Sequence, residues 1–200
     1  MTLHGCAGCT NDRIVIDKTV YRFGDPQPGD VVAFKAPTTS WDRDWRSPRS
    51  SNTVLRGLQN AASWFGFAPP DENNLVKRVI ATGGQQVECY KADNTGVTVD
   101  GQPLSEPYID VARQRGEGAD TSGNQGQSDP CYGPDFGPVL GPKGLLWVMG
   151  DNRSYSAGSR YHQEDHYHGT VPVDDVRGKV RFTIYLFSRI GTVSSIDPQR

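Results

Sequence analysis

Short apolar stretches separated by turn residues run through most of the chain and predict strands. Residues 13–21 and 30–34 read as two strands on either side of a turn-rich connection, and we expect them to form a β-hairpin. Further strands are predicted at 75–81, 97–102, 145–149 and 181–187. The 23 glycines and 14 prolines punctuate this pattern, and together they favour a mainly β fold over a helical one.

One segment shows helical periodicity instead. Its apolar residues recur every three or four positions, at Val54, Leu55, Leu58, Ala61, Ala62 and Phe65. This spacing predicts a short helix over residues 52–65, which Gly66 and the following prolines end. We interpret its apolar stripe as a core-facing surface rather than a membrane contact, because such stripes usually pack against the protein.

Charge and hydropathy exclude several classes of protein. The 21 basic and 23 acidic residues are interspersed and leave a net charge of −2, so no basic stripe is present and nucleic acid is not expected as a partner. No run of about 18 apolar residues occurs, and the first ten residues lack a signal-peptide pattern.

Cysteine usage indicates the compartment. Cys6, Cys9, Cys89 and Cys131 lack the spacing of two metal knuckles, so disulfides are the better interpretation. Cys6 and Cys9 could form a thioredoxin-like redox pair, but a strand-like segment follows them rather than a helix. We predict Cys6–Cys9 and Cys89–Cys131 pairs, the second closing off a glycine-rich loop at 111–130. Such pairs indicate an oxidising compartment outside the cytoplasm.

Two stretches carry candidate chemistry. Residues 149–160, directly after an apolar strand, are dense in polar side chains, which a purely structural network would also explain. Lys77 lies on a strand between apolar neighbours. Such a lysine is usually an edge residue that reaches water. If it is desolvated instead, its pKa falls from about 10.4 toward neutrality, and the amine can take a proton from a serine hydroxyl.

Together the two stretches resemble the conserved boxes of bacterial type I signal peptidases. The conserved motif around the general base is matched by Val76-Lys77-Arg78. A second motif, nearer the C-terminus and called the late box here, is matched by Gly150-Asp151-Asn152-Arg153 with Ser156, Ser159 and Arg160. Residues 28–37 and 169–179 resemble two further boxes. The resemblance implies a serine/lysine endopeptidase at the extracytoplasmic face of the bacterial cytoplasmic membrane. It would remove signal peptides from secretory preproteins after a small-x-small motif, without metal or cofactor.

The resemblance also implies roles for individual residues. Lys77 would be the general base and Ser156 would orient its amine. The site would be shaped by Arg78, Asp151, Asn152, Arg153 and Arg160. Shallow apolar pockets would hold the substrate, extended against the flanking strands, and would be lined by Leu3, Ile14, Val32 and Val76. The expected partners are signal peptides and the membrane surface.

Two departures from the family pattern affect these expectations. Of the nucleophile box Ser-Met-x-Pro-Thr-Leu only Thr2-Leu3 is present, with Met1 where the proline should stand. The serine and the membrane anchor would precede Met1, so we expect the chain by itself to be inactive. Gly158 stands where the family usually has an aspartate. Arg160 therefore needs another partner, for which Asp151 is a candidate.

The predicted architecture is a mainly antiparallel β catalytic core with one short helix. The core comprises residues 1–86 and 145–200, and residues 87–144 form an inserted β subdomain. A non-catalytic relative that binds signal peptides stays open as an alternative. The absent serine favours it, and the retained Lys77 and Ser156 oppose it. A repressor-type serine/lysine autoprotease fits the long insertion and the cysteines poorly. Residues 162–168 could hold a metal, although a polar loop is the favoured interpretation.

Overall fold

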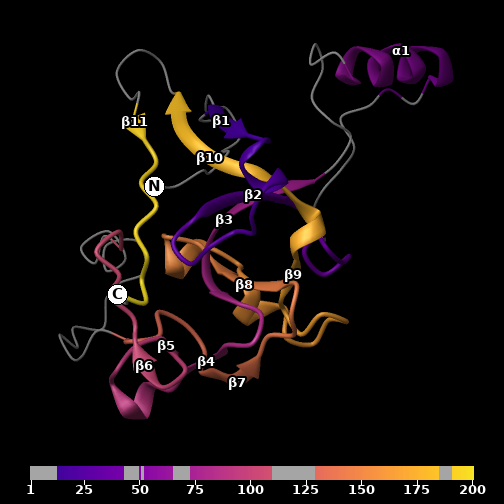
Figure 1. Ribbon diagram of the computed structural model, residues 1–200. Helices are drawn as coiled ribbons and strands as arrows, with labels where there is room; N and C mark the ends of the chain where they lie inside the picture. Colours follow the sequence, from indigo (N-terminus) through magenta and orange to yellow (C-terminus); the bar gives the residue numbers. More distant parts are fainter. Residues whose placement is uncertain (1–12, 43–49, 51, 65–72, 110–128, 185–190) are drawn as a thin grey trace, which may run out of the picture.

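Two antiparallel sheets make up most of the molecule (Figure 1). The computed structural model describes residues 13–42, 50, 52–64, 73–109, 129–184 and 191–200. The larger sheet has seven strands in the order β1-β10-β2-β3-β8-β9, and β11 pairs with β10. Its members are β1 (Arg13–Asp17), β2 (Val31–Lys35), β3 (Asn74–Thr82), β8 (Leu145–Met149), β9 (Val171–Pro172), β10 (Val176–Ile184) and β11 (Gly191–Thr192).

The smaller sheet has four strands in the order β6-β5-β4-β7. They are β4 (Gln86–Cys89), β5 (Thr98–Val99), β6 (Gln102–Pro103) and β7 (Phe136–Leu140). The Asp100-Gly101 turn joins β5 to β6, both of its residues having positive φ as this hairpin turn requires. The helices are α1 (Thr53–Trp64) and five 3₁₀ turns, η1 (Val20–Arg22), η2 (Lys91–Asp93), η3 (Arg153–Tyr155), η4 (Ser159–Tyr161) and η5 (Val173–Asp175).

The mainly β prediction is confirmed, but the predicted hairpin of the first two strands is wrong. β10 lies between β1 and β2 and pairs with both. The ion pair between Lys179 of β10 and Asp30, directly before β2, holds this arrangement, and Tyr21 donates a hydrogen bond of 2.9 Å to the same carboxylate. The connection between β1 and β2 contains η1 and spans the intervening strand, so it is not a tight turn.

Apolar side chains of β3 and β8 join the two sheets. Ile80 and Met149 pack with Val87 and Cys89 of β4 in one buried cluster. On the larger sheet, Val79 and Val148 belong to a second cluster, since successive strand residues point to opposite faces. β3 and β8 therefore carry both cores, and this fixes the strand segments that bear the candidate site.

The helix α1 stands apart from both sheets (Figure 1). Its large apolar side chains Val54, Leu55 and Leu58 are 76%, 48% and 64% exposed. The expectation that this stripe faces the core is therefore wrong, because no described element packs against it. Among the residues that the structure describes, no helix is long and apolar enough to cross a membrane.

The predicted disulfide between Cys89 and Cys131 is confirmed. It links β4 to the segment that precedes β7, across 42 residues of sequence. Cys6, Cys9 and most of the predicted loop at 111–130 lie outside the described residues. The disulfide anchors the part of the smaller sheet that approaches the candidate site.

Candidate active site

Lys77 and Ser156 lie together at the centre of the larger sheet. Lys77 is on β3, where it pairs with Val32 of β2, and the pairing of β3 with β8 begins at the next residue, Arg78. Its Nζ donates a hydrogen bond to Ser156 Oγ, which confirms the predicted contact. Ser156 itself follows η3 and does not lie on a strand. Burial, and secondarily the positive charge of Arg160, lowers the pKa of Lys77 from 10.5 to about 8.

Gly150 makes room for Ser156. It directly follows β8, and a β-carbon at this position would lie 2.0 Å from Ser156 Oγ. Only glycine therefore lets the hydroxyl come this close to the end of the strand. The glycine of the late box has a steric reason, which is to admit the side chain that contacts Lys77.

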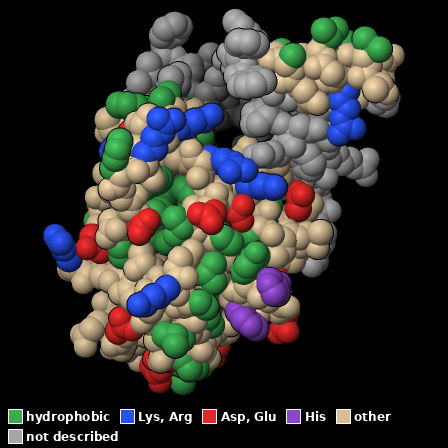
Figure 2. Space-filling view, turned by 45° about the vertical axis from the view of Figure 1, so that its right-hand side comes forward, with side chains coloured by type: hydrophobic (Ala, Val, Ile, Leu, Met, Phe, Trp, Pro, Cys, Tyr) green, Lys and Arg blue, Asp and Glu red, His purple; other side chains and the backbone are tan. Residues whose placement is uncertain are grey.

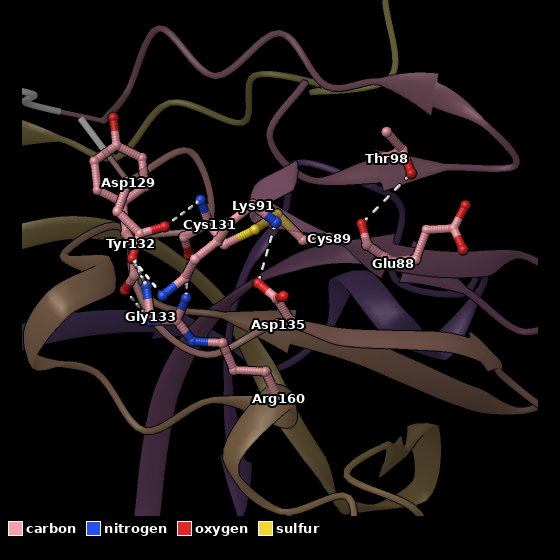
Figure 3. Close-up of a disulfide and its surroundings, with 10 residues drawn as sticks. All are labelled: Glu88, Cys89, Lys91, Thr98, Asp129, Cys131, Tyr132, Gly133, Asp135 and Arg160. Carbon is pink, nitrogen blue, oxygen red and sulfur yellow. Dashed lines mark hydrogen bonds and ion pairs between the residues drawn. A yellow bond between two sulfur atoms is a disulfide. The ribbon is translucent and has the colours of Figure 1, made fainter. Parts of the chain in front are cut away.

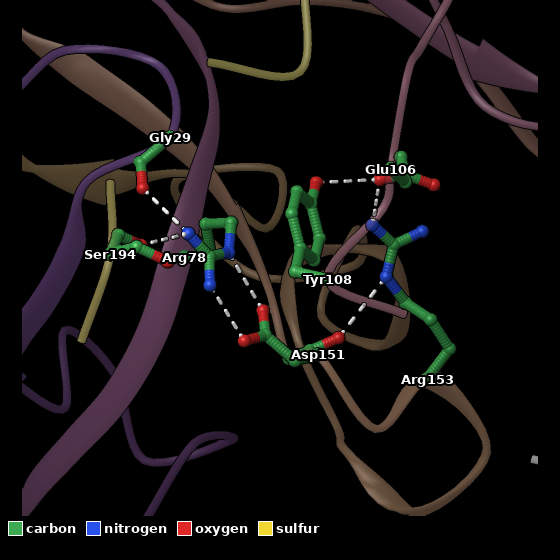
Figure 4. Close-up of polar contacts among 8 residues, drawn as sticks. Gly29, Arg78, Glu106, Tyr108, Asp151, Arg153 and Ser194 are labelled. Carbon is green, nitrogen blue, oxygen red and sulfur yellow. Dashed lines mark hydrogen bonds and ion pairs between the residues drawn. The ribbon is translucent and has the colours of Figure 1, made fainter. Parts of the chain in front are cut away.

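Arg78 connects four segments of the chain (Figure 4). It is 3% exposed and makes a bidentate pair with Asp151, with Nε–Oδ1 and Nη2–Oδ2 distances of 2.8 Å. Its Nη1 donates to the carbonyls of Gly29 and Ser194 at 2.8 and 3.1 Å. Because bidentate charged bonds are directional, Arg78 fixes the end of β8 relative to β3, the turn before β2 and the C-terminal segment.

Glu106 and Tyr108 extend this network, and our sequence reasoning missed both. The Arg78 guanidinium lies 4.0 Å from the centroid of the Tyr108 ring, whose hydroxyl donates to Glu106 at 2.9 Å. Glu106 pairs with Arg153, which is 1% exposed. Burial raises the pKa of Tyr108 above its usual value, which keeps the phenol neutral. The sequence offered only one indication of Glu106, which is that an arginine such as Arg153 requires a carboxylate partner if it is buried.

Arg160 is held by main-chain carbonyls (Figure 3). Its guanidinium donates to Cys131 O at 2.5 Å, to Tyr132 O at 2.9 Å and to Arg153 O. Cys131 thus links the disulfide to the site. The expected partner Asp151 instead pairs with Arg78. Gly158 leaves no space for the family's aspartate, because its β-carbon would lie 2.8 Å from Val148 O.

The other residues of the late box have structural contacts. Ser159 Oγ accepts a hydrogen bond of 2.8 Å from the Val148 amide, which fixes η4 against β8. Asn152 is 8% exposed, and its Nδ2 has no hydrogen-bond partner within the part of the chain that the structure describes. Most polar side chains of the late box therefore fix this segment against neighbouring parts of the chain.

The predicted pocket residues do not share one surface. Val32 pairs directly with Lys77 across β2 and β3, lies on the same face and is fully buried. Ile14 and Val76 pack against a cluster containing Ala33 and Val180 on the opposite face. Leu3 lies outside the described residues. The structure thus brings Ile14 and Val76 together and separates them from Val32.

The loop at 162–168 is attached to the segment before α1. Asp165 accepts hydrogen bonds from Trp41 Nε1 at 2.9 Å and Thr38 Oγ1 at 3.0 Å, and His162 stacks on Trp41 with ring centroids 4.1 Å apart. Across the described ranges, no group of three or more His, Cys, Asp or Glu is placed to hold a metal ion. Asp165 and His162 therefore hold this loop against the segment that contains Thr38 and Trp41.

The arrangement as a whole suits proton transfer. An amine with a pKa of about 8 is partly neutral near pH 7 to 8 and can act as a base. Ser156 restricts its orientation, and the buried Arg160 disfavours its protonation. What such a base needs is a hydroxyl or water to activate.

Comparison with known proteins agrees with this chemistry. The family model described as signal peptidase, peptidase S26, matches residues 8–185. The chain is 52% identical over its whole length to a probable signal peptidase I of Mycobacterium leprae, of which it covers 69%, and 52% identical to signal peptidase I of Mycobacterium tuberculosis, of which it covers 66%. The chain thus spans about two thirds of the length of these relatives.

A solved structure of a signal peptidase I from Enterococcus faecalis is 24% identical in sequence. The match has a TM-score of 0.44 and covers 77% of this chain and 95% of that one.

Proposed function

The chain belongs to the signal peptidase family, peptidase S26, and we propose that it is the catalytic body of a serine-type signal peptidase that removes signal peptides from secreted preproteins. The observation that carries the proposal is the contact of the buried Lys77 amine with Ser156. In this role Lys77 takes the proton from a serine nucleophile, and the serine attacks the scissile carbonyl to form an acyl-enzyme.

Ser156 is proposed as the residue that orients the amine rather than as the nucleophile. Its hydroxyl is held between Gly150 and Lys77, and a nucleophile also needs open access to the substrate. Arg78, Asp151, Asn152, Arg153 and Arg160 are proposed to hold this geometry. Each of the three arginines is buried, so they support the site from below.

Substrate recognition is proposed for Ile14 and Val76, beside the part of β3 that lies next to Lys77 and that pairs with β2 but not with β8 in the described structure. Both are half-buried and apolar, as a shallow pocket for small side chains requires. Val32 is proposed to act indirectly, by packing beside Lys77 and excluding water from the amine. We place the reaction at the extracytoplasmic face of the bacterial cytoplasmic membrane, which agrees with the Cys89–Cys131 disulfide.

The test is a comparison of two proteins on a preprotein with a small-x-small site. The first is the 200-residue chain, and the second is a form in which Ser-Met-x-Pro and a membrane anchor replace Met1. Mass spectrometry should detect cleavage only by the extended form, because no other serine of the sequence is proposed to react. Binding without cleavage by both forms would favour the alternative, a non-catalytic signal-peptide-binding protein.

The pH dependence follows from the lowered pKa of Lys77. The base acts in its neutral form, so kcat/KM of the extended form should rise with pH through about 8 and level off above it. Below that pH it should fall about tenfold per unit. A kcat/KM profile that is flat between pH 6 and 9 would contradict Lys77 as the base.

A Gly150→Ala substitution should lower activity without removing any reacting group. The new methyl group displaces Ser156 Oγ, and a misplacement of this size costs about 100-fold in kcat/KM. The matched control is Gly24→Ala, since nothing lies within 4 Å of a β-carbon there. Peptide-cleavage kinetics on the extended form should show normal activity for the control.

A Gly158→Asp substitution should destabilise the protein, although it restores the family's usual residue. The side chain would be forced against Val148 O and Met149 Cα, at 2.8 and 3.1 Å from the β-carbon. We expect a loss of about 1–3 kcal/mol in the free energy of unfolding, measured by urea denaturation. Increased stability would show that the site can accept the aspartate.

A further inference from the structure

We propose that Glu106 and Tyr108 are positioning residues of the catalytic site, which hold the late box in place relative to Lys77. Both lie on the segment that follows β6, and neither belongs to the matched motifs. The proposal rests on the proposed peptidase function and deepens it, because it gives residues outside those motifs a part in the reaction.

The segment that bears the two residues is fixed through its backbone and its packing. The Ser105 amide donates to Pro198 O at 2.8 Å, and the Ile109 amide donates to Glu106 O at 3.1 Å. Leu104 packs against the buried cluster that joins the two sheets. Substitution of either proposed side chain therefore leaves these anchors in place.

The Glu106 carboxylate differs from the charged groups of the molecular surface. Figure 2 shows acidic side chains spread over one face of the molecule, where water can solvate them. The Glu106 side chain is instead 14% exposed, and it pairs with Arg153, whose side chain is 1% exposed. A guanidinium buried this deeply needs a carboxylate to compensate its charge. Within the described ranges, Glu106 is the carboxylate that pairs with it.

Arg153 links Glu106 to the late box (Figure 4). Its Nε donates to Gly150 O at 3.1 Å, and Ser156 Oγ lies directly against Gly150. The main-chain carbonyl of Arg153 also accepts a hydrogen bond from Arg160. The turn between Gly150 and Ser156 is thus fixed by a guanidinium that Glu106 keeps in its buried position.

Tyr108 connects the same carboxylate to Arg78. Its hydroxyl donates to Glu106 Oε1 at 2.9 Å, the oxygen that also accepts from Arg153. The Arg78 guanidinium lies 4.0 Å from the centroid of the Tyr108 ring, a geometry that stabilises a cation. Burial, and then the negative charge of Glu106, raises the pKa of the phenol above its usual range, so it stays a hydrogen-bond donor. One segment therefore holds both arginines.

This arrangement predicts an effect on the chemical step rather than on substrate binding. The proposed recognition residues Ile14 and Val76 belong to a separate cluster. Loss of the Glu106 charge lets the turn at Ser156 move, and Ser156 then orients the Lys77 amine less well. A misplacement on the order of 1 Å between reacting groups costs about 100-fold in rate.

The experiment compares kcat and KM of Glu106→Gln, Tyr108→Phe and the unmodified sequence, all in the extended form and under conditions in which urea denaturation shows them folded. Glu106→Gln keeps the shape of the side chain and removes its charge, so kcat should fall about 10- to 100-fold with KM within about twofold. Tyr108→Phe keeps the ring against Arg78 and removes one hydrogen bond, so kcat should fall about three- to tenfold.

The matched control is Glu88→Gln on β4. Glu88 is a half-buried carboxylate of the smaller sheet whose main-chain carbonyl accepts from Thr98, and its substitution should leave kcat and KM unchanged. In an Arg153→Met background, Glu106→Gln should cause no further loss of kcat, since residues that act through one another are not additive. Unchanged kcat in Glu106→Gln, or its full additional loss in the Arg153→Met background, would overturn the proposal.

A measurement on the 200-residue chain separates this inference from the proposed function. Amide NMR spectra should show the Ser156 resonance shifted in Glu106→Gln and unshifted in Glu88→Gln, whether or not any peptide is cleaved. Absence of cleavage by the unmodified extended form would count against the peptidase alone. An unchanged Ser156 resonance in Glu106→Gln would overturn the positioning role, even with a fully active peptidase.

Discussion

Replacement of Lys77 by alanine in the extended form should abolish signal-peptide cleavage. Lys77 is the only amine in contact with Ser156 among the described residues, and its lowered pKa makes it a base near neutral pH. Removing the general base of a unit that acts together costs at least about 10³-fold in kcat/KM. Peptide-cleavage kinetics measure the loss, and Lys77→Arg should be equally inactive because a guanidinium stays protonated.

The control for this experiment is Lys35→Ala. Lys35 lies on the neighbouring strand β2 but is exposed, so its removal should leave kcat/KM within about twofold of the parent. Ser156→Ala should lose activity less completely than Lys77→Ala, since it orients the amine without reacting. Full activity of the Lys77→Ala form would assign the chemistry to other residues.

Replacement of Arg78 by methionine should cause a large loss of stability. The substitution leaves Asp151, whose side chain is 16% exposed, without its bidentate partner. It also removes the donor to the Gly29 and Ser194 carbonyls. Breaking a buried ion pair from one side costs about 3–5 kcal/mol, measurable as the free energy of unfolding in urea.

The matched control is Arg181→Met. Arg181 pairs with Asp17 at 3.3 Å on the same sheet, but the two side chains are 42% and 30% exposed. Because exposed pairs contribute little, its loss should cost less than about 1 kcal/mol. If the two substitutions had equal effects, Arg78 would not be the connection between the four segments that its contacts indicate.

Local patterns in the sequence predicted the strands and part of the site. β8 follows from an uninterrupted apolar run, and β3 from an apolar run that Lys77-Arg78 interrupts. Lys77 and Ser156 meet because the two matched boxes belong to neighbouring segments. Glu106 and Tyr108 were not predicted, since no local pattern marks them. Their role arises only when the segment that follows β6 packs against Arg78.

Two wrong predictions have a common physical origin. The hairpin of the first strands failed because pairing with β10 bridges more than 160 residues of sequence, and short-range turn signals contain no information on such partners. The core assignment of α1 failed because helical periodicity reports an apolar face without reporting what covers it. Both outcomes depend on contacts between segments that are far apart in the sequence. β1 makes such a contact with β10, and the apolar face of α1 makes none with the described residues.

The hydrogen bonds from Arg160 to main-chain carbonyls limit the substitutions that this site can accept during evolution. An aspartate at position 158 would have no space for its side chain. It would also have no available ion-pair partner in Arg160, because the guanidinium is already bonded to the Cys131 and Tyr132 carbonyls. Such an aspartate could be accepted only after the strand at Val148 had shifted and the cysteine-bearing segment had withdrawn. Gly158 and the Cys89–Cys131 bridge are therefore expected to be inherited together, and a lineage that loses one should show compensating substitutions at the other.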